Sequence, residues 1–230
     1  MIRVFFAVLA VLCVVGSVTA FRLSLSSAYN HQAMRYELFW QKQGAPRDEA
    51  QWQRALDWSA RALALDESNP AMHLRRSRLL SWYGSLSELD GNRYVENLDK
   101  AATHVERAVV LHPYSAEGYS SRAALTAQRG LVNEQLNSDI VRSLAMGPWE
   151  RDVYLRVLNA GLFNWPRLED STRAALRQYF DLAVKEKPGV AREMFAIAAR
   201  YNRLSLLCSR LAYLQGDGIT DFTAQQCKST

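Results

Sequence analysis

Apolar residues recur along most of the chain at spacings of three and four, which is the period of an α-helix and not of a strand. The segment "WQRALDWSARALAL" is typical, with Trp52, Leu56 and Leu63 along one face and charged residues opposite. Alternating β-branched runs are missing, and so are Asn-Gly or Asp-Gly turns between apolar segments. The pattern predicts an all-α protein whose helices are separated at Pro and Gly.

A recurring phrase, a helix end followed by a proline boundary, divides the chain into helix hairpins. It appears as "SARALALDESNP", "ERAVVLHP", "VRSLAMGP" and "FDLAVKEKP". The step from Pro113 to Pro148 is 35 residues, close to the tetratricopeptide period of about 34. The step from Pro148 to Pro188 is longer, at 40 residues. We expect about five hairpins, which span roughly 29–67, 70–112, 115–147, 150–187 and 190–214.

Small residues occupy the positions that stacked hairpins require. Gly84 and Gly130 end predicted first helices, and Ala62 and Ala108 lie where a second helix must approach its neighbour. One hairpin cannot bury its apolar face alone, whereas stacked hairpins can. The chain resembles tetratricopeptide-repeat proteins across nearly all of Tyr29 to Leu214, although the Trp-Leu-Gly-Tyr positions of the first helix are mostly replaced. The predicted fold is a TPR-like α-solenoid of about five hairpins behind one N-terminal apolar helix.

The stretch "AVVLHPYSAEGY" predicts the junction between two hairpins residue by residue. A histidine beside a proline is compatible with a catalytic loop, but the repeat assigns His112 to a spacer and Pro113 to the boundary. Ser115 is the predicted N-cap of the next helix, with Gly118 three residues further on.

The start of the chain is a separate apolar segment. "VFFAVLAVLCVVGSVTAF" lies between Arg3 and Arg22 without a charge, and a helix of that length spans a hydrocarbon core of about 30 Å. Val18-Thr19-Ala20 also fits a signal-peptidase site, so cleavage after Ala20 is the alternative. We favour an uncleaved anchor because few residues separate the run from the first predicted helix. The predicted segments are 1–22 (anchor or signal peptide), 23–214 (helical repeats) and 215–230 (C-terminal tail).

Charge and cysteines limit the partners and the compartment. The net charge of +5 comes from 28 basic and 23 acidic residues without a basic run, so nucleic acid is not an expected partner. Cys208 and Cys227 lie 19 residues apart, and the N-terminal segment leads us to expect that this part of the chain is exported. They form either a disulfide or a buried thiol and a free thiol in the tail.

No pattern of residues predicts catalysis. Metal-ligand spacing, a Gly-x-Ser-x-Gly elbow and a phosphate-binding glycine loop are all missing, and the histidines are His31, His73, His104 and His112. We expect no catalytic, cofactor or metal site.

A candidate binding groove is predicted instead from equivalent positions of successive repeats. Trp82 lies near the end of a first helix with Arg78 one turn before it, and Gln128 and Asn159 occupy comparable places in the next units. The alternatives are a groove filled by the anchor-proximal helix or one that is only solvated.

A more specific resemblance lies in the C-terminal half. It rests on "GPWERDVYLRVLNAGLFNWPRLEDSTRAALRQYF" and "AIAARYNRLSLLCSRL", within roughly Ala108 to Cys208. These segments resemble the VpsP-type family of membrane-anchored repeat proteins encoded with bacterial exopolysaccharide biosynthesis machinery. The matched motifs are structural, and the family offers no catalytic residues to transfer.

The resemblance implies a non-catalytic accessory protein of surface polysaccharide (biofilm) assembly or export. Such a protein would have an inner-membrane anchor, a periplasmic body and other polysaccharide-assembly proteins as partners. The alternatives are a glycan-binding module that guides the polymer and a polysaccharide-modifying enzyme.

Overall fold

The computed structural model of the chain describes residues 2–86, 90–186, 188–213 and 227, which form helices and turns without a strand. The all-α prediction is confirmed. The α-helices are α1 (Ile2–Gln43), α2 (Glu49–Leu65), α3 (Pro70–Ser81), α4 (Gly91–Leu111), α5 (Ala116–Gln128), α6 (Glu134–Met146), α7 (Arg151–Phe163), α8 (Asp170–Glu186), α9 (Pro188–Arg200) and α10 (Leu204–Tyr213). Two short 3₁₀-helices, η1 (Trp82–Ser85) and η2 (Trp165–Arg167), follow α3 and α7.

Consecutive helices pack in pairs that follow the predicted hairpin ranges, except that α1 begins at Ile2 and not near residue 29, and α9 begins at Pro188. The pairs in contact are α1 with α2, α3 with α4, α5 with α6, α7 with α8 and α9 with α10. Side chains cap several helix starts, because the first backbone N–H groups of a helix have no partner inside it. Ser115 is one of them: its hydroxyl accepts from the Gly118 N–H at 3.0 Å, as predicted.

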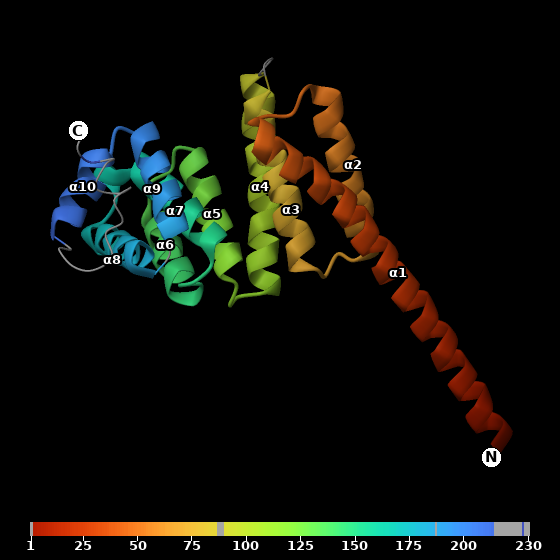
Figure 1. Cartoon of the computed structure of the whole chain (residues 1–230). Helices are drawn as coiled ribbons and strands as arrows, with labels where there is room; N and C mark the ends of the chain where they lie inside the picture. Colours follow the sequence, from red (N-terminus) through yellow and green to blue (C-terminus); the bar gives the residue numbers. More distant parts are fainter. Residues whose placement is uncertain (1, 87–89, 187, 214–226, 228–230) are drawn as a thin grey trace. The chain divides into compact units, whose positions relative to one another are not determined.

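The chain divides into two compact units, Met1–Leu111 and His112–Thr230. We call them the N-terminal unit, with α1 to α4, and the C-terminal unit, with α5 to α10 (Figure 1). The division falls inside the predicted repeat segment 23–214, at the seam between Leu111 and His112.

α1 is a single helix that crosses the predicted boundary between Arg22 and Leu23 (Figure 1). Residues 4–24 are exposed on every side, whereas Ser26, Glu37 and Trp40 are buried against the rest of the N-terminal unit. Among the described residues, one helix is long and apolar enough to cross a membrane by length and composition, and it is this one. A signal sequence meets the same test.

Side-chain contacts between helices hold the N-terminal unit together at two places. At one end Trp52 Nε1 donates to the Leu79 carbonyl at 2.7 Å, and its ring centroid lies 5.0 Å from that of Tyr83. At the other end the Ser26 hydroxyl donates to the Ala62 carbonyl at 2.8 Å. The first contact therefore joins α2 to α3 and η1, and the second joins α1 to α2 where α1 enters the unit.

The C-terminal unit is built by neighbour-to-neighbour packing. The first helices α5, α7 and α9 contact one another in chain order, and the second helices α6, α8 and α10 do the same. One cluster of buried apolar side chains draws on all six helices. Each pair thus buries its apolar face against the next pair.

Two glycines shape α5 and α6. Gly130 has φ 74°, and the Leu131 N–H donates to the Thr126 carbonyl at 3.1 Å, which is the Schellman closure of a helix. A Cβ on Gly147, at the end of α6, would lie 2.7 Å from the Ala116 Cβ of α5. Only glycine allows the two helices to approach so closely.

Candidate functional site

Two of the predicted groove residues, Arg78 and Trp82, lie in the N-terminal unit against α1. Arg78 Nε donates to Glu37 Oε1 at 2.6 Å, and Arg75 donates to Glu37 Oε2 at 2.6 Å. The Glu37 side chain is 5% exposed. The Trp82 ring packs edge-on against Trp40 at 5.9 Å. Arg78 and Trp82 thus help to hold α1 on α3 and η1.

The other two, Gln128 and Asn159, lie in the C-terminal unit. Gln128 is the exposed last residue of α5. Asn159 is half-buried on α7, and its Oδ1 accepts from the Tyr201 hydroxyl at 2.9 Å. The four predicted residues therefore form no single group within either unit.

Asn159 belongs to a small surface cluster that the sequence did not reveal. The Phe163 ring, 56% exposed, lies 5.5 Å from the Tyr201 ring. Within the described part of the chain, the Asn159 amide NH₂ has no hydrogen-bond acceptor. We call Asn159, Phe163 and Tyr201 the turn cluster, since Phe163 and Tyr201 stand where α7 and α9 end. It presents an apolar ring beside an amide donor.

Arg203 adds an uncompensated donor to the same α9–α10 turn. Its Nε is buried and finds no hydrogen-bond partner among the residues that the structure describes. Asn202 before it adopts a left-handed backbone with φ 53°. Buried polar atoms are nearly always paired. The Arg203 Nε–H is therefore an unusual buried donor at the end of the C-terminal unit that holds the turn cluster.

A histidine pair, His73 buried and His104 half-buried, joins α3 and α4. His73 Nε2 lies 2.9 Å from the Glu67 carbonyl, which can only accept, so His73 carries its proton there. His104 Nδ1 therefore donates to the bare His73 Nδ1 at 3.0 Å. Burial, then the Arg76 guanidinium and His73, lower the pKa of His104 to about 4. His104 is therefore neutral at ordinary pH, and the contact between the two rings links the two helices of the hairpin.

A pair of tyrosines, Tyr154 and Tyr179, contributes to packing in the C-terminal unit. Burial raises the pKa of Tyr154 to about 12, and its ring packs edge-on against Tyr179 at 5.5 Å. In the described ranges no set of three or more His, Cys, Asp or Glu side chains is placed to hold a metal ion. His31 and His112 are exposed.

A small apolar depression of about 20 Å³, room for about one water molecule, lies between α7, α8 and α10. Its walls include Leu158, Phe180 and Leu207, and two arginines stand among its lining residues. Arg210 pairs with the Asp181 carboxylate, and Arg177 lies over the Trp165 ring at 5.3 Å. The depression brings together no acid, base or nucleophile suited to a reaction.

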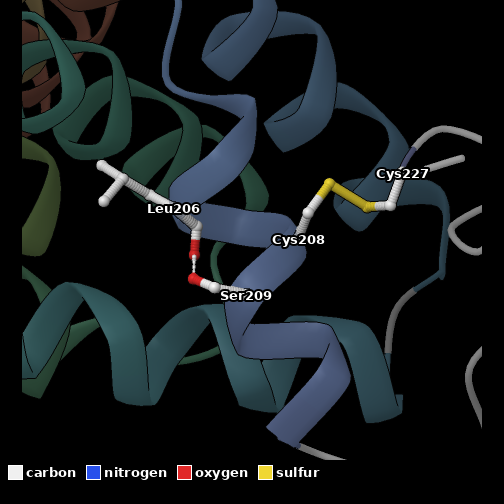
Figure 2. The surroundings of a disulfide bond; sticks show 4 residues. All are labelled: Leu206, Cys208, Ser209 and Cys227. Atoms are coloured by element: carbon white, nitrogen blue, oxygen red, sulfur yellow. Dashed lines mark hydrogen bonds between the residues drawn. A yellow bond between two sulfur atoms is a disulfide. The ribbon is translucent and has the colours of Figure 1, made fainter. Parts of the chain in front are cut away.

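Cys208 of α10 and Cys227 are joined by a disulfide (Figure 2). Their Cα atoms lie 5.5 Å apart. Next to Cys208, the Ser209 hydroxyl donates to the Leu206 carbonyl of the same helix at 3.1 Å. Apart from Cys227, the predicted tail 215–230 lies outside the described residues. A bond across 19 residues restricts the unfolded chain and stabilises the fold by about 3 kcal/mol.

The chain was compared with known proteins. No family model matches it, and no curated protein matches it.

Proposed function

We propose that this chain is a non-catalytic, membrane-anchored scaffold that acts through protein–protein contacts on a TPR-like helical-repeat surface. The supporting observation is the stacking of α5 to α10, in which first helices contact first helices and second helices contact second helices. Such stacking gives repeat proteins extended surfaces for partner helices and peptides. The apolar half of α1 is the proposed anchor in a bacterial inner membrane, with the body in the periplasm.

The proposed process is the biosynthesis or export of a surface polysaccharide. It rests on the resemblance of the segments around "GLFNWPRL" and "RYNRLSLLC" to the VpsP-type family. The scaffold would hold other polysaccharide-assembly proteins together at the membrane.

Co-purification tests the scaffold. The full chain, tagged after Thr230 and extracted from its own membranes in mild detergent, should bring polysaccharide polymerase or export proteins with it. A Phe163→Ala variant, which truncates the exposed ring of the turn cluster, should lose part of that set. The matched control is Tyr114→Ala, because Tyr114 is an exposed aromatic residue of the same unit, at 81%, outside the turn cluster. Recovery of the chain alone would contradict the proposal.

Glycan binding is a second candidate, favoured by the turn cluster. Exposed aromatic rings offer an apolar face to the C–H side of a sugar, and an amide with a spare donor suits its hydroxyls. In this alternative the full chain is retained on immobilised polysaccharide from its own source. Phe163→Ala and Asn159→Ala should then elute early and Tyr114→Ala should not. Equal elution of all three variants would remove this candidate.

A further inference from the structure

The apolar half of α1 is exposed to solvent around its whole circumference. Residues 4–24 carry no buried side chain, and Leu12 and Phe21 are 62% and 69% exposed. A helix that is apolar on every side must be surrounded by protein or by lipid, and no described residue covers this one. About 20 residues of helix are about 30 Å long, the thickness of the hydrocarbon layer. The occupant that fits this surface is a lipid bilayer.

The folded part of the N-terminal unit begins almost immediately after that segment. Arg22 ends the uncharged run, and Ser26 is already fully buried. The Ser26 hydroxyl contacts the Ala62 carbonyl at 2.8 Å and the Met72 sulfur at 3.2 Å. Four residues of helix rise only about 6 Å, and the headgroup layer of one leaflet is about 5–8 Å thick. The end of α2 and the start of α3 must therefore lie at headgroup level, and a tilt of α1 only brings them closer.

The side chains at this end of the unit suit such an interface. The rings of Tyr29 and Trp58 lie 5.6 Å apart and are both half-buried. The Arg61 guanidinium lies 5.0 Å from the Trp58 ring. Tyr, Trp and basic residues collect where hydrocarbon meets headgroups. The turn that follows α2, residues 66–69, carries the carboxylates of Asp66 and Glu67 beside the exposed Ser68.

The possible cleavage site after Ala20 lies inside the same helix. The Thr19 hydroxyl donates to the Val15 carbonyl at 2.9 Å, and the helix continues without a break to Gln43. Proteolytic cleavage concentrates in exposed, poorly ordered segments. Removal of residues 1–20 would require this stretch to leave the helix.

We propose that α1 stays in the membrane as a permanent anchor and holds the N-terminal unit directly against the lipid headgroups, with the 66–69 turn toward the bilayer surface. This rests on the anchor of the proposed function and adds the height and orientation of the body. An anchor joined through a free linker would leave the body away from the lipid.

Probe depth in vesicles tests this arrangement. Ser68→Cys and Ser85→Cys, each in a Cys13→Ser background, place a fluorophore on exposed serines at opposite ends of α3. The full-length variants are reconstituted in phosphatidylglycerol/phosphatidylethanolamine vesicles that contain a headgroup-linked quencher. Because α3 and η1 separate the sites by roughly 20 Å, we expect at least about threefold stronger quenching at position 68. Equal quenching at both sites would overturn the proposal.

Two further measurements separate this proposal from the anchor itself. Ten Gly/Ser residues inserted between Arg22 and Leu23 should make quenching at the two positions equal while the chain still sediments with vesicles. A chain that does not sediment removes the anchor together with the proposed function. Intact mass of the membrane-bound protein should include residues 1–20, and their absence would refute the permanent anchor.

Discussion

At the scale of single residues, the connection between α1 and the N-terminal unit depends on Glu37. Its carboxylate is buried and accepts from Arg75 and Arg78, both mostly shielded from solvent. Breaking a buried ion pair is costly, because the desolvation of the remaining charges is no longer offset by their attraction to the lost partner. Glu37 therefore keeps α1 on α3.

We expect Glu37→Gln to lower the free energy of unfolding of the full chain in detergent by about 2–3 kcal/mol. The control is Glu49→Gln, which removes an ion pair with Arg93 whose side chains are 52% and 45% exposed. Urea titrations followed by circular dichroism compare the two variants. An equal shift of the urea midpoint in both variants would show that burial does not make the ion pairs of Glu37 more stabilising than the exposed pair of Glu49.

At the scale of helices, α5 and α6 meet at the contact between Gly147 and Ala116. There is no space for a further methyl group, since its carbon would approach the Ala116 Cβ to 2.7 Å. The helix end must then move or the packing of Ala116 must give way.

Gly147→Ala should therefore cost about 1–3 kcal/mol of stability through overpacking. Gly91→Ala is the control, because a Cβ there meets nothing within 4 Å. The double variant Gly147→Ala with Ala116→Gly should recover part of the loss. Thermal unfolding compares the two single variants and the double variant with the parent. A Gly147→Ala protein as stable as the parent would contradict the close approach of α5 and α6 at this glycine.

The α3–α4 hairpin should respond to acid through His104. Its folded pKa is about 4, whereas an unfolded histidine titrates near 6.5. Between these values the unfolded chain takes up a proton and the folded chain does not, so stability falls as the pH drops from about 6.5 to about 4. The slope reaches about 1.4 kcal/mol per pH unit where the unfolded chain binds one proton more than the folded chain, and solvent screening of the half-buried ring lowers the total change.

Urea midpoints at intervals between pH 7 and pH 4 check this response. His104→Gln should flatten the profile in that range, and His112→Gln, at an exposed position, should not. The carboxyl groups of Glu49, Glu96 and Asp170 have lowered pKa values through their Arg or Lys partners. Their contribution is lost below about pH 4.5 and is separate from that of His104.

Local signals predicted the helix pairs, because Pro, Gly and capping residues act on their own neighbours in the chain. The range 115–147 holds α5 and α6, and Ser115 caps α5 as expected. Contacts between distant residues had no such signal. Asn159 was predicted from its position, but Phe163 and Tyr201 were missed because their pairing joins the ends of α7 and α9. The continuity of α1 was missed because Arg22 and the serines after it resemble a break in the apolar pattern.

At the scale of the whole molecule, the proposed anchor and the disulfide point to the same compartment. Disulfides persist in oxidising environments such as the bacterial periplasm, and Cys208–Cys227 is formed in the C-terminal unit. An exported body with a single N-terminal anchor satisfies both features.

The topology is checked with alkaline phosphatase, which is active only after export. Fusion after Thr230 should be active, and the same fusion to a chain that lacks residues 4–21 should be inactive. An inactive full-length fusion would place the body on the cytoplasmic side.

Because α1 is uninterrupted, it also fixes how the N-terminal unit is rotated about the helix axis relative to the apolar half of α1. Successive residues of a helix are turned by about 100° about its axis, so the side of α1 that carries Ser26, Ala33, Glu37 and Trp40 has a set azimuth relative to any lipid-embedded face of the same helix. A partner bound to that face in the membrane would meet the N-terminal unit at one defined angle. One residue added near Arg22 would turn the unit by about 100° and seven would nearly restore it, which makes the length of this helix a determinant of direction as well as of reach.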